Sequence, residues 1–142
     1  MKTTKLNRLT RTFFPCVLAT MLMLAFSSCA QKALFLTSSI VPAAQGEVAV
    51  TKDKNNNYVV KLKISNLADV DRLQPPKNSY VVWMETDRGL ARNIGRINTS
   101  NQLNVSFETV SSFRPNRIFI TAEEEENTQY PGQMVVLTTN RF

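Results

Sequence analysis

The stretch NYVVKLKIS, residues 57–65, decides the fold class because apolar and polar side chains alternate along it. Its apolar side chains fall on one face, and they are Tyr58, Val60, Leu62 and Ile64. The side chains between them fall on the other face, and they include Lys61, Lys63 and Ser65. A period of two is typical of an antiparallel strand with one face in a core and the other in water. The stretch therefore predicts a half-buried β-strand.

The preceding stretch predicts a partner for this strand. In GEVAVTK, residues 46–52, Val48 and Val50 alternate with smaller or polar residues. The segment KDKNNN, residues 52–57, joins the two runs and is rich in the residues that favour turns. The two runs are therefore expected to form an antiparallel hairpin.

Further strands are expected towards the C-terminus. SYVVWMET, residues 79–86, is apolar on both faces, which favours a central place in a sheet. NQLNVSFE, residues 101–108, returns to alternation, with Leu103, Val105 and Phe107 facing inward. The remaining strand-like runs are RIFITAE (117–123), QMVVLTT (133–139) and the apolar patch that follows Ala33.

These runs predict an all-β protein. About seven or eight short strands, separated by Pro, Gly and Asn turn signals and without a convincing helix, are typical of an antiparallel, immunoglobulin-like β-sandwich. A small closed barrel is the alternative. No regular alternation of strands with long helical patterns occurs, which disfavours a parallel α/β fold.

Residues 1–28 have the layout of a secretory signal peptide. Four bases and no acid precede an apolar run, residues 13–26, and small residues follow it. The run is too short to span a bilayer, because a spanning helix needs about 20 apolar residues. Export across a bacterial inner membrane is therefore expected.

Cys29 ends this segment, and the residues Phe26-Ser27-Ser28-Cys29 resemble a bacterial lipobox. The resemblance implies that Cys29 is acylated, for example with palmitate, and becomes the mature N-terminus. Residues 29–32 would then be the lipidated tether and residues 33–142 the folded domain. Cleavage after Ala30, which would leave a soluble protein, is the alternative. A metal or catalytic role for Cys29 is disfavoured because the chain has no histidine and its other cysteine, Cys16, lies in the apolar run.

Removing the signal changes the charge balance. The chain has 17 Lys and Arg against 11 Asp and Glu, and four of the bases belong to residues 1–28, which leaves 13 bases, 11 acids and a net charge of +2. The basic character of the precursor is therefore no sign of nucleic-acid binding. In some lipoprotein-rich bacteria an acidic run after the acylated cysteine directs export to the cell surface. No such run follows Cys29, so a periplasm-facing position on the outer membrane is expected.

The strands also resemble the extracytoplasmic domain of anti-sigma-K factors. The similarity covers roughly residues 46–138, and its characteristic positions are Tyr80, Trp83, Gly95, Glu123, Pro131 and Gly132. The resemblance implies a shared fold, because most of these are packing and turn residues. Those factors hold their sigma factor with a cytoplasmic N-terminal domain joined to a membrane-spanning helix. Neither has a counterpart in this sequence, so no direct contact with a cytoplasmic sigma factor is expected.

Two charged groups are weak candidates for binding. Arg88, Arg92 and Arg96 form a basic group that would suit lipid headgroups or an acidic partner, although loop arginines are usually only solvated. Clustered carboxylates such as Glu123, Glu124, Glu125 and Glu126 can bind calcium, but consecutive strand residues point to opposite faces. A solvated hairpin tip is the favoured interpretation of these four glutamates. Trp83 is expected in the core, with a ligand platform as the alternative.

No constellation of catalytic groups is recognisable. The carboxylates Asp69, Asp71, Glu85 and Asp87 lie in or beside predicted turns, with no histidine to assist them. The expected function is therefore a non-enzymatic binding or structural module of the cell envelope, without metal or cofactor, that contacts an envelope protein or a glycan. The alternative is an accessory or sensor component of an anti-sigma system.

Overall fold

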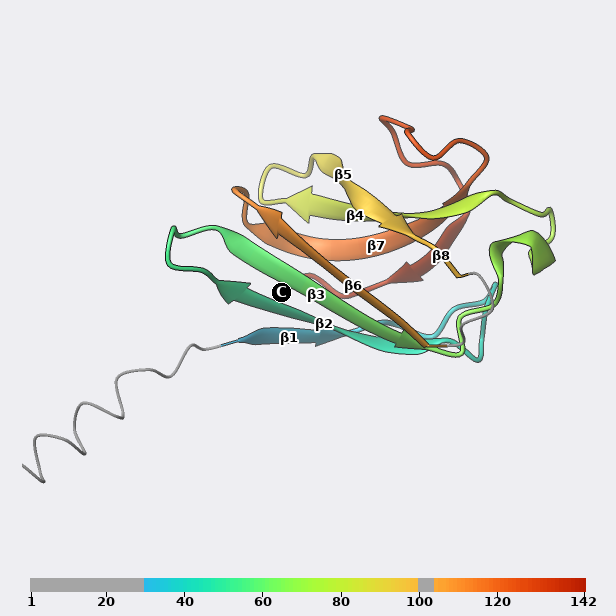
Figure 1. The fold of residues 1–142 in the computed structure, drawn as a ribbon, viewed down its shortest axis with the longest axis horizontal. Helices are drawn as coiled ribbons and strands as arrows, with labels where there is room; N and C mark the ends of the chain where they lie inside the picture. Colours follow the sequence, from blue (N-terminus) through green and yellow to red (C-terminus); the bar gives the residue numbers. More distant parts are fainter. Residues whose placement is uncertain (1–29, 100–103) are drawn as a thin grey trace, which may run out of the picture.

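In the part of the chain that the structure describes, eight strands form two four-stranded antiparallel sheets (Figure 1). This computed structural model describes residues 30–99 and 104–142, so Cys29 and the predicted signal lie outside the described residues. The predicted antiparallel β-sandwich of seven or eight strands is confirmed. None of the helices within the described ranges is long and apolar enough to cross a membrane.

The first sheet has the strand order β1-β2-β3-β6. Its strands are β1 (Gln31–Leu34), β2 (Gln45–Lys52), β3 (Tyr58–Ser65) and β6 (Asn104–Ser111). The alternation that predicted β3 is confirmed, since Val60, Leu62 and Ile64 are buried whereas the two lysines between them are exposed. The predicted hairpin of β2 and β3 is also present, and Asp53 stabilises its turn by accepting hydrogen bonds of 2.8 Å from the backbone N–H groups of Asn55 and Asn57.

The second sheet has the strand order β5-β4-β7-β8. Its strands are β4 (Ser79–Thr86), β5 (Ala91–Ile97), β7 (Pro115–Glu123) and β8 (Val135–Thr138). All eight residues of β4 are buried, and β4 pairs with a strand on each side. The central place predicted for the doubly apolar run SYVVWMET is therefore confirmed. A short 3-10 helix (Val70–Arg72) lies on the way from β3 to β4.

The segment around β1 links the two sheets. It pairs with β2 as far as Leu34, and then Phe35 forms a bridge with Thr139 while the Leu36 N–H donates a 2.8 Å hydrogen bond to the Thr138 carbonyl. One short segment thus closes an open side of the sandwich. The strand begins at Gln31, two residues before the expected entry at Ala33.

The main core lies between the sheets. It is built of inward-facing aliphatic side chains together with Tyr80, whose hydroxyl donates a 3.0 Å hydrogen bond to the Ala68 carbonyl. Burial, with the charges of Asp69 and Asp71 nearby, raises the pKa of Tyr80, which keeps this buried hydroxyl neutral. As predicted, Val105 is buried and Phe107 packs against the core, while Leu103 lies outside the described residues.

The sandwich has two distinct ends. At the entry end, where β1 begins, lie the connections 53–57, 87–90 and 112–114 (Figure 1, left). The far end carries the connections that follow β1, β3 and β7. Three strand pairings fix this arrangement, because each joins strand ends at the same end of its sheet. Gln31 pairs with Val50, Tyr58 with Ser111, and Thr86 with Pro115.

Candidate functional site

The structure separates the three arginines predicted as a basic group. Arg88 lies exposed in the turn before β5, whereas Arg92 and Arg96 belong to β5 itself and not to a loop. A bulge in the β4–β5 pairing sets Arg92 opposite Met84 of the main core but Arg96 opposite Val81 of the outer face. Paired residues share a face of a sheet, so the two arginines diverge.

Each strand arginine has its own partner. The guanidinium of Arg92 lies over the Phe113 ring, 4.1 Å from its centroid, at the entry end. Arg96 forms an ion pair with Glu126 on the outer face of the second sheet. The bulge contains Gly95, whose φ of 143° favours glycine and whose Cβ, if present, would lie 2.7 Å from the Phe107 ring. The sequence showed the glycine but not the bulge, because the bulge arises from pairing with β4.

The four glutamates predicted as a hairpin tip also diverge. Glu123 ends β7 and accepts hydrogen bonds from the Thr121 hydroxyl (2.5 Å) and the Gly132 N–H (2.7 Å). Glu124 bonds Lys77 at 2.8 Å, and this hydrogen bond and positive charge lower the pKa of Glu124. Within the described ranges, no three His, Cys, Asp or Glu side chains are grouped so that they could hold a metal ion.

Trp83 lies in a second, smaller core on the outer face of the second sheet. It is fully buried and stacks with Phe119, their ring centroids 6.3 Å apart, beside Val81. Its indole N–H donates a 2.8 Å hydrogen bond to the Thr121 hydroxyl. The expectation of a buried tryptophan is therefore confirmed, and the ring is not available as a surface platform.

The connection between β7 and β8 is tied across this outer face. The Asn93 amide donates a 3.1 Å hydrogen bond to the Thr128 carbonyl, and Arg96 pairs with Glu126. The Gly132 N–H is bound to Glu123, as described above. The two charged groups that were separate binding candidates, the arginines and the glutamates, are thus joined through Arg96 and Glu126.

Glu85 is the one buried carboxylate in the outer face of the second sheet within the described residues. It is 5% exposed, accepts a hydrogen bond from Arg141 and forms an ion pair with Arg117, each at 2.6 Å. Two guanidinium groups compensate a single buried negative charge, which is the arrangement expected of a structural ion pair. Glu85 lies in strand β4, beside the turn that follows it, as predicted.

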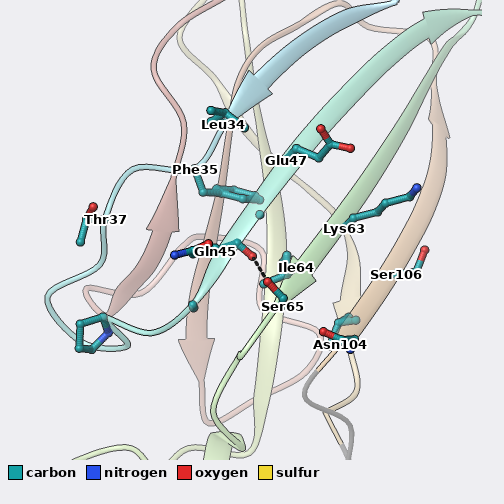
Figure 2. Close-up of a pocket in the computed structure, with 14 residues that line it drawn as sticks. Leu34, Phe35, Thr37, Gln45, Glu47, Lys63, Ile64, Ser65, Asn104 and Ser106 are labelled. Carbon is teal, nitrogen blue, oxygen red and sulfur yellow. Dashed lines mark hydrogen bonds between the residues drawn. The ribbon is translucent and has the colours of Figure 1, made fainter.

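A groove on the first sheet is the most developed concave site among the described residues (Figure 2). It has a volume of about 790 Å³ and lies in the half of the sheet near the far end. One cross-strand row forms part of its floor, with Leu34, Glu47, Lys63 and Ser106 side by side on β1, β2, β3 and β6. A second row, Gln45, Ser65 and Asn104, lies next to the first.

The short β1 strand creates this groove. Because the chain leaves the first sheet after Leu34 to reach β8, Phe35 and Pro42 form the wall beside β2. Gly46 lies within the lining, where a Cβ atom would be only 2.6 Å from the Lys63 carbonyl oxygen. No local pattern indicates the groove, since residues of four separate strands, β1, β2, β3 and β6, assemble it.

The groove has the chemistry of a binding site. Apolar surface from Leu34, Phe35 and Pro42 lies beside hydroxyl and amide groups. Glu47 and Lys63 are cross-strand neighbours, and neither forms an ion pair with another residue of the described ranges. Apolar walls with a few polar groups are typical of ligand sites. Its lining includes no histidine, cysteine or paired carboxylates.

Comparisons with known proteins add no relative. No family model matches the chain, and no curated protein or solved structure matches it significantly.

Proposed function

We propose that this chain is a lipid-anchored protein of the bacterial cell envelope, whose sandwich is a non-enzymatic binding module. The observation that carries the proposal is the lipobox-like FSSC sequence directly before the fold. Cys29 precedes the first residue of β1, Gln31, by only two positions. An extended chain spans at most about 3.6 Å per residue, so an acylated Cys29 would hold the entry end within about 7 Å of its anchor.

The position of the groove supports the binding role. With the entry end held at the membrane, the groove near the far end is turned towards the aqueous compartment, where an envelope protein or a glycan would reach it. The cross-strand row on the floor of the groove includes one carboxylate and one ammonium group, Glu47 and Lys63. Such a pair suits a partner segment that carries both charges or several hydroxyl groups.

A role as an accessory of an anti-sigma system is the weaker proposal. Of the residues that carry the resemblance, Tyr80 and Trp83 are buried, and Glu123 bonds the backbone of Gly132. These residues support the fold, which many unrelated functions share. A sigma-factor gene beside this one would favour this proposal over the first.

Acylation provides the direct test. The full-length chain is expressed in a bacterial host fed with an alkyne-tagged palmitate. It should be labelled and should fractionate with membranes, and its mass should be that of a chain that begins at an acylated Cys29. Cys29→Ala should remain an unlabelled precursor. The matched control is Cys16→Ala, which removes the other cysteine but leaves the lipobox unchanged, and it should be labelled normally. An unlabelled, soluble wild-type protein that begins at Gln31 would refute the anchor.

A further inference from the structure

We propose that the entry end of the sandwich is itself a membrane-binding surface, which rests on anionic lipid headgroups and orients the domain. This inference rests on the proposed function for its occupant, a lipid membrane. The surface consists of the connections 53–57, 87–90 and 112–114 together with the strand ends that they join. It differs from the basic group predicted from the sequence, because Arg96 lies on another face and bases from β1, β2 and β6–β7 take its place.

Charge is the first observation. Eight bases and three acids lie at the entry end, and they are Lys32, Lys52, Lys54, Arg88, Arg92, Arg114, Arg117 and Arg141 against Asp53, Glu85 and Asp87. The far end has the opposite balance, with Arg72, Lys77 and Arg96 against Asp69, Asp71 and Glu123 to Glu126. A domain with a net charge of only +2 is thus strongly polarised along its length, with its positive end where the chain enters.

Exposed apolar side chains are the second observation. Leu90 is 56% exposed and Phe113 is 47% exposed, and both lie in connections of the entry end. Arg92 lies over the Phe113 ring. An apolar side chain next to a guanidinium suits the membrane interface, where the ring enters the headgroup layer and the charge binds phosphate.

The third observation joins these groups to the point where the chain enters. Gln31, Lys52, Tyr58 and Arg114 line one small cavity of about 290 Å³, so bases from two different connections surround the start of β1. Lys52 lies over the Tyr58 ring, 5.2 Å from its centroid. Cys29, the residue proposed for acylation, precedes Gln31 by two positions, so the anchor and the cationic surface would meet the same membrane.

The test uses the mature protein as the host processes it, reconstituted in vesicles. With Cys29 acylated and Cys16 removed with the signal, Ser112→Cys supplies the one free thiol for an environment-sensitive fluorophore. We expect its emission to shift to the blue in vesicles that contain phosphatidylglycerol but not in pure phosphatidylcholine. The same fluorophore at Asn127→Cys, an exposed position of the far end, should keep the emission of a water-exposed dye in both kinds of vesicle.

Charge reversal identifies the binding groups. Arg88→Glu with Arg114→Glu should abolish the blue shift, and in a sedimentation assay it should lower the partition of the unanchored chain into anionic vesicles by about tenfold or more. Arg72→Glu, which makes the same kind of change at an exposed far-end residue, is the control and should have no effect. Raising the salt concentration should weaken binding of the wild-type protein, since exposed charges are screened.

The outcomes separate the two proposals. If Cys29 proves not to be acylated, the unanchored chain added to the same vesicles still tests the surface, and selective binding to anionic vesicles would support it. An acylated protein with the fluorophore at position 112 in water, or with equal signals in both lipid compositions, would overturn the surface and leave the anchor intact. Self-association through this end without lipid, or binding only to an acidic protein, would also overturn it.

Discussion

At the residue scale, Trp83 shows how one side chain can serve as the centre of a second core. Its ring is sealed on the outer face of a sheet by Phe119, Val81 and the connection that follows β7. The sequence correctly indicated burial, because a lone tryptophan on a strand with two apolar faces is usually part of a core. It could not indicate which face the ring lies on, since that depends on the register with β7.

We predict that Trp83→Ala lowers the free energy of unfolding by about 3–5 kcal/mol, since it removes a large ring from a closed site. Trp83→Phe should cost less, because a second aromatic ring can still pack on Phe119. Thr121→Val, which keeps the ring but removes both the acceptor of the indole N–H and the donor to Glu123, is the comparison and should cost about 1–3 kcal/mol. Denaturant titration measures all three. A loss below about 1 kcal/mol for Trp83→Ala would contradict the second core.

A second prediction at this scale concerns pH. The Lys77 hydrogen bond and charge lower the pKa of Glu124 from its usual value, so the folded state favours the ionised carboxylate. The contact therefore contributes stability above the pKa of Glu124 in the unfolded chain and loses it as the pH falls through the lower folded value.

Lys77→Met should return the pKa of Glu124 towards 4.5, its ordinary value, as followed by NMR titration of the side-chain carboxyl carbon. Lys61→Met, which removes an exposed lysine paired with a different glutamate, Glu108, provides the control and should leave the pKa of Glu124 lowered. An unchanged Glu124 titration in the variant would show that the ion pair is not formed in solution.

At the element scale, the strands differed in how far the sequence could predict them. β3 and β4 were predicted with their faces because alternation and double burial are properties of a single strand. β5 was not predicted from its own pattern, and its arginines were assigned to loops, because four of its seven residues are polar, charged or glycine and its bulge depends on β4. β1 begins earlier than expected because its ladder with β2 extends to Gln31, and no local signal marks that point.

We predict that amide hydrogen exchange will follow this hierarchy. The amides of Val82 and Ile120, in the paired centres of β4 and β7, should exchange only through global unfolding. Amides of β1 should exchange faster through local opening, because β1 is a four-residue edge strand with a single partner in its sheet. Equal protection of the β1 and β4 amides would show that the contact between β8 and the segment after β1 holds this edge strand as firmly as a central strand.

At the scale of the whole molecule, the sequence was sufficient for the fold class but not for the surfaces. An antiparallel sandwich follows from strand patterns that can be read one at a time. The groove and the polarised ends depend on which strands become neighbours, as in the row from Leu34 through Glu47 and Lys63 to Ser106. The predicted arginine group failed to assemble for the same reason, since a single bulge turns Arg92 and Arg96 to opposite faces.

The two ends and the groove together make a prediction about partners in the cell. If the entry end faces the membrane, a photo-crosslinking amino acid at Ser106, in the groove, should capture an envelope protein or glycan in intact cells. The same amino acid at Ser112, at the entry end, should capture lipid. Lys63→Glu should reduce capture from position 106, because it reverses the only ammonium group among the residues that line the groove.

The exposed Lys61, on the same strand and face as Lys63 but paired with Glu108, provides the matched control. Lys61→Glu makes the same charge change outside the groove lining and should leave capture from position 106 intact. Both substitutions should change the free energy of unfolding by only about 0.5 kcal/mol, because they lie on the solvated face of β3. Capture that is equally strong in wild-type, Lys61→Glu and Lys63→Glu proteins would show that the partner does not use the groove charges. Capture of the same protein from positions 106 and 112 would contradict the orientation itself, because one end would no longer be reserved for the membrane.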